Sequence, residues 1–289
     1  MNVYEIITER ISDKLNQGTI PWHKPWKGGP SDLPHNGATN HEYRGANVWM
    51  LGCQGYDSPK WLTFKQVNAL KGKIRKGERS TPVIFWKWNK KTDSEGKEQS
   101  FPFLRYYNVW NVEQCDDLPE RLTLPKEESL PEFEPIAACE ELTSMYLKRE
   151  TIELQEKSNR AFYMPSGDYI NMPKRDSFKV GEEYYATMFH EMGHSTGHAN
   201  RLKRTGIVGS HYFGDSVYSK EELCAEMTAA FLCGVHNIDN VTIENSAAYI
   251  QSWLTSLKKN PKWFVQAAAQ AQKAADFIQG KTFEKGESK

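Results

Sequence analysis

The sequence predicts an α+β protein of two domains, and three observations lead to this prediction. First, the zero net charge hides a split. Residues 1–115 carry 17 Lys and Arg against 11 Asp and Glu, residues 116–160 carry 6 against 12, and residues 161–289 carry 14 against 14. Second, seven of the nine tryptophans lie in the first 110 residues. Third, the aromatic β-rich runs fall in the front half, whereas helical spacing dominates the back half.

In the front half, helical and β patterns are separated by a loop rich in proline and glycine. Residues 2–17 place apolar side chains at helical spacing before a glycine, which predicts an amphipathic helix. Thr63 can cap a second helix that runs to Lys71. The runs at 81–88 (TPVIFWKW) and 101–110 (FPFLRYYNVW) predict two antiparallel strands, with a long polar hairpin loop between them.

Residues 116–136 are acidic and contain four prolines, which predicts an extended linker between a domain at 1–115 and a domain at 137–289. We therefore expect the two domains to fold independently. The back domain is predicted to be mostly helical with a small sheet around a Ser-Gly-Asp turn. Its expected helices cover 137–150, 182–196, 220–235, 247–257 and 261–278, and its β runs lie within 162–173.

Several classes of protein are disfavoured by the composition. No apolar run reaches the roughly 18 residues that a membrane-spanning helix needs. The N-terminus lacks the apolar core and cleavage site of a signal peptide. The five cysteines are an odd number without a CxxC pair, which argues against a disulfide framework or a thiolate zinc site. We therefore expect a cytoplasmic protein with no membrane partner, and the sequence leaves its oligomeric state open.

The strongest chemical signal is the run His190-Glu191-Met192-Gly193-His194 in the predicted helix at 182–196. On a helix, His190 and His194 project from one face one turn apart, so both imidazoles can bind one metal ion. Glu191 lies at the edge of that face, where it can act as the general base that deprotonates a water. The helix also has an apolar face and should be buried. Two histidines and a glutamate on a buried helix favour a catalytic metal site over solvated or core histidines.

A catalytic zinc ion takes three protein ligands, so one more residue is required. The spacing HExxHxxGxxH does not apply, because Asn200 stands where its last histidine would be. The alternative is a carboxylate from the helix at 220–235. We expect Glu222 to bind the metal and Glu226 to hold a ligand histidine by its other ring nitrogen, although the reverse assignment stays open. Glu221 is expected to face solvent, and the expected cofactor is Zn²⁺ or another divalent metal in its place.

Two further groups are candidates for substrate contacts. The residues from Asp168 to Met172 predict a short edge strand on which an extended peptide can pair, with Asp168 and Ile170 as the substrate-strand residues. An ordinary hairpin strand is the alternative. Tyr212 or Tyr218 can supply a phenol to the reacting oxyanion, or can simply pack.

Cations and aromatic residues are interleaved in the front half. The basic cluster at 71–79 is followed by two tryptophans, and the loop at 21–29 combines two tryptophans with two lysines. Cations contact phosphates and aromatic faces stack on exposed bases, which favours single-stranded over duplex DNA. A tryptophan core with a rim of solvated lysines is the alternative. The predicted DNA contacts are Lys24, Trp26, Arg44, Lys73, Arg75, Lys76 and Arg79.

Taken together, these stretches resemble the ArdC family of antirestriction proteins of conjugative plasmids. The resemblance rests on PWHKPW, PHNGATNHEYRGANVWML, KWLTFKQVNALKGKIRKGERSTPVIFWKW, LRYYNVWNVEQC, FYMPSGDYINMP, HEMGHSTGHANRL and YSKEELCAEMTAAFL. It implies an N-terminal single-stranded DNA-binding domain, a C-terminal zincin-like metallopeptidase domain, and protection of incoming plasmid DNA from host restriction.

Three functions follow from these patterns. The first is a DNA-tethered metallopeptidase that cleaves a protein substrate on or near single-stranded DNA. The second is a non-enzymatic shield of single-stranded DNA with a structural or vestigial metal site. The third is a regulatory metalloprotease whose front domain binds protein. Glu191 favours a catalytic design, because a structural site needs ligands but no general base.

Overall fold

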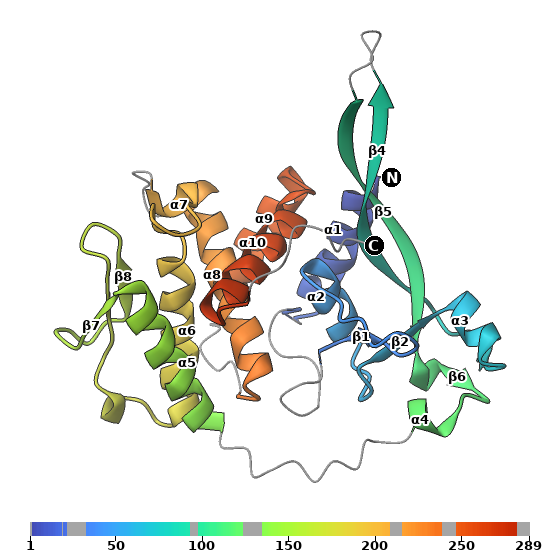
Figure 1. Ribbon diagram of the computed structural model, residues 1–289, viewed down its shortest axis with the longest axis horizontal. Coiled ribbons are helices and arrows are strands. Elements are labelled where there is room, and N and C mark those ends of the chain that lie inside the picture. The colour runs from blue at the N-terminus through green and yellow to red at the C-terminus, as the bar shows by residue number, and fades with distance from the viewer. Residues whose placement is uncertain are drawn as a thin grey trace.

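The computed structural model describes residues 2–18, 20–21, 33–92, 98–123, 135–208, 216–238 and 247–281. Its front half combines sheets with short helices, and its back half is mostly helical with a small sheet (Figure 1). The predicted α+β class with two different halves is therefore confirmed. No helix in the described part of the chain is long and apolar enough to cross a membrane.

A four-stranded sheet in the order β1-β2-β5-β4 organises the front half. β5 runs antiparallel to both β2 and β4, and a second sheet pairs β3 with β6. The strands are β1 (His35–Asn36), β2 (Lys60–Thr63), β3 (Lys73–Ile74), β4 (Thr81–Thr92), β5 (Glu98–Asn111) and β6 (Cys115–Asp116). The helices are α1 (Val3–Asn16), α2 (Ala46–Gly52), α3 (Phe64–Ala69) and α4 (Glu120–Thr123), with a 3-10 turn, η1 (Val112–Gln114).

The predicted hairpin is present, but its strands are longer than expected. Cross-strand pairing continues to Thr92 and resumes at Glu98, through polar residues that the sequence indicated as loop. The predicted cap of α3 is also present, because the Thr63 side chain accepts a hydrogen bond from the backbone N–H of Gln66. Helix α2 was not predicted. All seven of its residues are buried, so its sequence has no amphipathic period to detect.

The back half consists of helices beside a three-stranded sheet in the order β7-β9-β8. The strands are β7 (Glu153–Gln155), β8 (Phe162–Met164) and β9 (Tyr169–Asn171). The helices are α5 (Pro135–Glu150), α6 (Gly181–Ser195), α7 (Thr205–Val208), α8 (Ser216–Val235), α9 (Ala247–Lys259) and α10 (Trp263–Ile278), with a 3-10 turn, η2 (Arg175–Ser177). The predicted helices at 137–150 and 182–196 correspond to α5 and α6.

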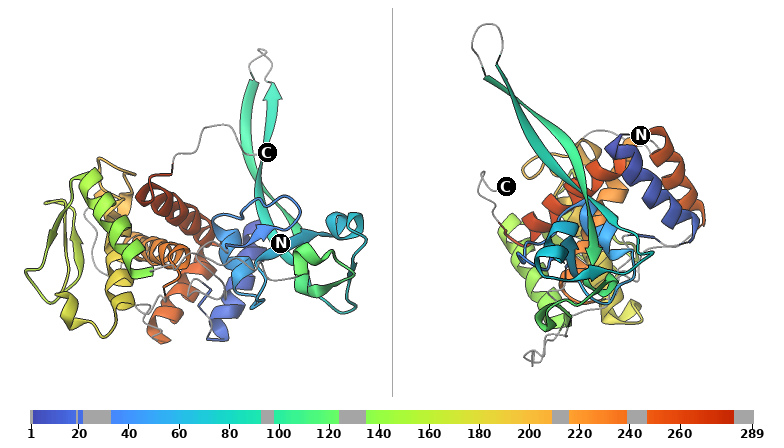
Figure 2. Two further views of the ribbon diagram at one scale, coloured as in Figure 1. Left: turned by 60° about the horizontal axis from the view of Figure 1, so that its bottom comes forward. Right: turned by 90° about the vertical axis from the view of Figure 1, so that its right-hand side faces the viewer.

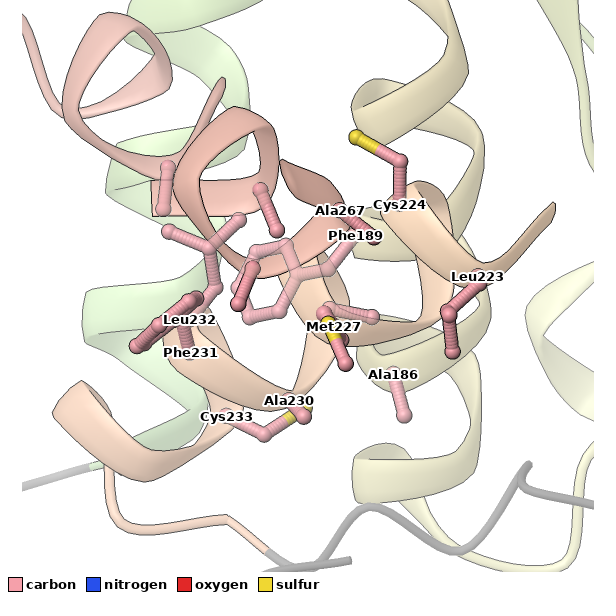
Figure 3. Close-up of a cluster of buried hydrophobic side chains, with 14 of the residues drawn as sticks. Ala186, Phe189, Leu223, Cys224, Met227, Ala230, Phe231, Leu232, Cys233 and Ala267 are labelled. Atoms are coloured by element: carbon pink, nitrogen blue, oxygen red, sulfur yellow. The ribbon is translucent and has the colours of Figure 1, made fainter. Parts of the chain in front are cut away.

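Helices α6, α8 and α10 meet in an apolar contact (Figure 3). Phe189 of α6, Met227 and Phe231 of α8 and Ala267 of α10 are all buried in it. Because apolar side chains interdigitate in such contacts, the packing sets the register between neighbouring helices. It therefore positions α6 and α8, the helices on which the sequence places the metal ligands.

One apolar core extends across both halves of the chain. Ile7 and Ile11 of α1 and Trp49 of α2 are buried in the same cluster as Phe231 of α8 and Phe264 of α10. The ring centroids of Trp49 and Phe231 lie 4.4 Å apart. This shared core argues against the expected independent folding of the two halves, because separating them would expose its apolar surface to water.

The expected linker also differs from the structure over its first part. Residues 115–123 contain β6 and α4, and Leu122 is buried in a small front-half cluster with Leu62 and Val67. Residues 124–134 lie outside the described part of the chain. The proposed boundary near residue 115 remains a prediction.

We expect Phe231→Ala to destabilise both halves together, by about 3–5 kcal/mol, because it removes a buried ring from the shared core. Denaturation followed by tryptophan fluorescence and by far-ultraviolet circular dichroism should give one coincident, shifted transition. Met145→Ala is the matched control. Met145 is 53% exposed on α5, so its truncation should change the free energy of unfolding by no more than about 0.5 kcal/mol. Two separate transitions, of which only one moves, would contradict a shared core.

Candidate functional site

The two histidines of the HEMGH run lie one turn apart on α6 and face a carboxylate of α8. Their Nε2 atoms are 3.1 Å apart. Each Nε2 lies 3.5 Å from a different oxygen of Glu222. Among the described residues, His190, His194 and Glu222 form a group whose possible ligand atoms all lie within 4.8 Å of one another.

These distances fit a bound divalent ion. Two nitrogens bound tetrahedrally to one zinc ion at about 2.0–2.1 Å lie about 3.3 Å from each other. The separation of 3.1 Å between the imidazoles and 3.5 Å to the carboxylate are close to that value. Two imidazole nitrogens and one carboxylate oxygen are also a donor set that zinc uses in catalytic sites. The three residues can therefore hold a divalent metal ion.

The charged groups of the cluster perturb one another. Burial by itself lowers the pKa of His194, but hydrogen bonds to Glu221 and Glu222 outweigh it and raise that pKa. The pKa of His190 is raised in the same way, because Glu222 outweighs burial. The two histidines in turn hold the pKa of Glu222 well below its usual range, despite burial. Because metal binding requires neutral imidazoles, protons compete with a metal here and acid weakens its binding.

The other carboxylate that the sequence singled out on α8 lies on the far side of His190. Oε1 of Glu226 is 3.9 Å from Nδ1 of His190, and burial raises the pKa of this carboxyl. Its Oε2 atom is buried and has no hydrogen-bond partner among the described residues. Glu222, rather than Glu226, is thus the residue that faces both Nε2 atoms. Glu191 is buried on α6 and is not part of the group of three.

Glu221 is buried, and the expectation that it faces solvent is wrong. Its Oε1 lies 3.3 Å from Nδ1 of His194, and Arg204 donates hydrogen bonds to both of its oxygens, at 2.9 Å and 2.5 Å. Burial raises the pKa of Glu221, but Arg204 and His194 outweigh it and lower that pKa. No sequence pattern indicated this role, because Arg204 lies outside the predicted helices.

Arg204 also binds the end of α6. It donates to the hydroxyl of Thr196 at 2.6 Å and to the carbonyl of Gly193 at 2.7 Å. Gly193 itself lies against α8, where an added Cβ would come within 3.2 Å of the Cα of Ala225. The small residues Gly193 and Ala225 thus allow the two helices to approach closely.

The predicted substrate strand is not at an edge. β9 pairs with β7 on one side and with β8 on the other, so its backbone groups are already used. Ile170 is fully buried, and Asp168 accepts hydrogen bonds from Arg201 and Tyr163. The expectation that Asp168 and Ile170 belong to an edge strand is therefore wrong, and β9 cannot pair with a peptide through its backbone. The short apolar run of β9 predicted a strand but not its partners. A third strand, β7, precedes the β8–β9 hairpin in the chain and pairs with the free side of β9.

Some predicted residues lie outside the described part of the chain. Lys24 and Trp26 fall within residues 22–32, and Tyr212 falls within residues 209–215. The side chain of Tyr218 is likewise not described. The DNA contacts and the oxyanion role suggested for these residues stay predictions.

The predicted basic contacts of the front half are partly engaged within the protein. Arg44 forms an ion pair with Asp276 of α10. Lys73 pairs with Asp117 at 3.0 Å, and Arg75 pairs with Glu78 at 3.0 Å and Asp116 at 3.6 Å. Nearby acids thus neutralise part of the basic cluster at 71–79. Counting the cations along the sequence did not reveal these pairs. Lys76 and Arg79 are exposed.

Comparison with known proteins agrees with this architecture. Residues 141–270 match the family described as zincin-like metallopeptidase, and residues 1–110 match the N-terminal domain of anti-restriction factor ArdC. The metal-free crystal structure of the antirestriction ArdC protein from plasmid R388 superposes with a TM-score of 0.76 at 35% identity, covering 96% of this chain and 97% of that one. Its Mn(II)-bound structure gives the same TM-score at 34% identity, covering 97% and 98%.

Curated relatives include two proteins named DNA primase TraC from Escherichia coli, each 35% identical over 95% of this chain. The chain spans only 27% and 20% of their lengths. A protein of Sinorhizobium fredii, y4eC, is 31% identical over 96% of this chain and 91% of its own length. The back half thus has the fold of a zincin-like metallopeptidase domain. The chain as a whole belongs to the ArdC family of antirestriction proteins.

We expect Glu221→Ala to weaken metal binding about 10–100-fold, because the variant frees the Nδ1 side of His194. Glu221→Gln should be affected less, since its amide oxygen still accepts a hydrogen bond. Titration of the metal-stripped protein with Zn(II) or Mn(II) against a chelator measures this effect. Glu141→Ala, on an exposed position of α5, is the control. Equal affinities in folded Glu221→Ala and wild type would show that Glu221 does not orient the imidazole.

Proposed function

We propose that this protein binds single-stranded DNA through its front half, holds zinc or another divalent ion in a peptidase-type site in its back half, and protects incoming plasmid DNA from host restriction. The convergence of His190, His194 and Glu222 carries the metal part of the proposal. The match of residues 1–110 to the ArdC N-terminal domain and their excess of cations support the DNA part.

In the proposed site, the histidines and acidic residues of α6 and α8 have different roles. His190, His194 and Glu222 would hold the ion, while Glu226 and Glu221 orient the imidazoles through their Nδ1 atoms. A divalent ion held by these residues would supply a Lewis acid that activates a water molecule and polarises the carbonyl of a peptide. Glu191 accepts a proton from the attacking water and delivers it to the leaving amine.

The described strands also limit where a peptide can pair with the small sheet. Because β9 is central, the free backbone edges are those of β7 and β8. β8 packs beside α6, the helix that carries His190 and His194. We propose the outer edge of β8 as the edge that binds an extended peptide, since main-chain pairing there brings the peptide beside that helix.

A second candidate function is a shield in which DNA coating alone gives protection and the metal site is structural or vestigial. The exposed aromatic residues Phe85 and Tyr107 of the front half favour it, because stacking side chains are what strand coating requires. The two candidates share the DNA-binding half and differ only in whether Glu191 is needed.

The metal ligands can be tested by separate substitutions on α8. We expect Glu222→Ala to lose stoichiometric metal, because it removes the oxygens that face both Nε2 atoms. Glu226→Ala should keep the metal with affinity lowered about 10–100-fold. Metal content after gel filtration distinguishes the two variants. The reverse outcome, with metal lost only in Glu226→Ala, would reverse the assignment, and metal retained in a His190→Ala, His194→Ala double variant would refute the site.

The role of Glu191 separates the two candidate functions. Glu191→Gln should keep the fold, the metal and the DNA affinity, and should lower any peptide hydrolysis by a factor of about 10²–10⁴. We expect protection of transferred plasmid DNA to persist in this variant, because coating needs only the front half. Plasmid transfer into a restricting host, with wild type and Glu191→Gln in parallel, measures it. Loss of protection by a folded, DNA-binding Glu191→Gln protein would favour proteolysis instead.

A further inference from the structure

The β4–β5 hairpin projects away from the rest of the molecule (Figures 1 and 2). It also exposes aromatic side chains. Phe85, Trp86, Tyr106 and Tyr107 are 41%, 47%, 45% and 38% exposed. Large aromatic side chains gathered on an outer surface, with polar residues around them, are typical of interaction sites. The hairpin therefore has an exposed aromatic surface on which a partner molecule can bind.

The strand register sorts these side chains onto two faces. Directly paired residues of an antiparallel ladder share a face, and successive residues point to opposite faces. One face, here called the cationic face, carries the cross-strand pairs Val83–Tyr107, Phe85–Arg105 and Lys87–Phe103. The opposite face carries Trp86 and Tyr106, paired with Leu104 and Ile84.

On the cationic face, two aromatic residues lie opposite cations. Arg105 faces Phe85 across the strands, and its guanidinium also lies 4.9 Å from the ring centroid of Phe103, which faces Lys87. The ring centroids of Phe85 and Tyr107 are 5.7 Å apart, and both cations are exposed.

The ribbon differs in charge from the basic turn that the sequence singled out. At the turn, Lys73 and Arg75 are paired with acids. The ribbon segments whose side chains are described around these cations, 81–87 and 102–109, contain no Asp or Glu. Lys87 and Arg105 therefore keep a positive potential beside exposed rings, which suits a ligand that carries phosphates next to flat bases.

We propose that the cationic face of the β4–β5 hairpin is the surface that binds single-stranded DNA. Bases stack on Phe85, Tyr107 and Phe103, while Lys87 and Arg105 contact the phosphates. This inference rests on the DNA-binding role proposed above and assigns it to a surface. Because stacking uses ring faces and not base edges, binding is weakly selective in sequence. Duplex DNA binds poorly, since its bases are already stacked on each other.

Neighbouring tyrosines on opposite faces provide a matched test. The probe is a single-stranded oligothymidine of about 16 nucleotides, and the full chain is used throughout. Phe85→Ala, Tyr107→Ala should weaken binding at least about tenfold, because each stacked ring contributes substantially to affinity. Trp86→Ala, Tyr106→Ala removes equally exposed rings from the opposite face and should stay within about twofold of wild type. Circular dichroism confirms that each variant is folded.

A second pair of variants tests the cations without removing any ring. Lys87→Gln, Arg105→Gln should reduce the slope of log affinity against log salt by about 1.4, since each lost phosphate contact on a single strand contributes about 0.7. Lys148→Gln, Lys179→Gln removes two exposed lysines of the back half, so it is the control and should leave the slope unchanged.

The outcomes separate this inference from the proposed function. If the wild-type chain does not bind the oligonucleotide, both the proposed DNA-binding function and its assignment to the hairpin are refuted. Wild-type binding that persists unchanged in both cationic-face variants would overturn the inference and leave the DNA function standing. If Trp86→Ala, Tyr106→Ala loses as much affinity as Phe85→Ala, Tyr107→Ala, the assignment of binding to the cationic face is refuted. Self-association that is lost in Phe85→Ala, Tyr107→Ala while DNA binding persists would show that the ribbon contacts protein.

Discussion

The contact between α6 and α8 at Gly193 is the constraint on which the candidate metal site depends. A Cβ at this position would lie 3.2 Å from the Cα of Ala225, so the two helices approach as closely as residues without large side chains allow. At that separation Glu222 reaches the Nε2 atoms of both His190 and His194. On the apolar side of the same helix pair, Phe189 and Phe231 are buried and keep the helices in register.

Bringing so many charged groups into a partly buried space has an electrostatic cost that the network of partners offsets. A buried charge without a partner destabilises a fold strongly, whereas hydrogen-bonded partners compensate for its lost hydration. Arg204 is such a partner, because it binds Glu221 and the carbonyl of Gly193 at the same time. The three acids of α8 thus contact different imidazole nitrogens. Glu222 faces the Nε2 atoms of both histidines, whereas Glu221 faces Nδ1 of one and Glu226 faces Nδ1 of the other.

Helix α2 joins the two halves of the molecule. The side chain of Asn47 donates to the carbonyl of Ile84 and accepts from its N–H, both at 2.8 Å, and so holds the base of β4. Two residues further along, Trp49 packs on Phe231 of α8. The projecting ribbon and the helix that carries Glu222 are therefore attached to the same buried element. This arrangement agrees with the matches of one chain to the N-terminal domain of ArdC and to a zincin-like metallopeptidase domain.

The sequence by itself determined the features that lie within single segments. The spacing of His190 and His194 on one face of α6 follows from the 3.6-residue period of a helix, and the cap at Thr63 follows from local hydrogen bonding. Only the tertiary structure decided the contacts between segments. It buried Glu221 against Arg204, placed β9 in the centre of its sheet, and set Phe85 opposite Arg105 across the ribbon. These features depend on helix register and strand pairing, which arise from the packing of residues far apart in the chain and leave no periodic trace in the sequence.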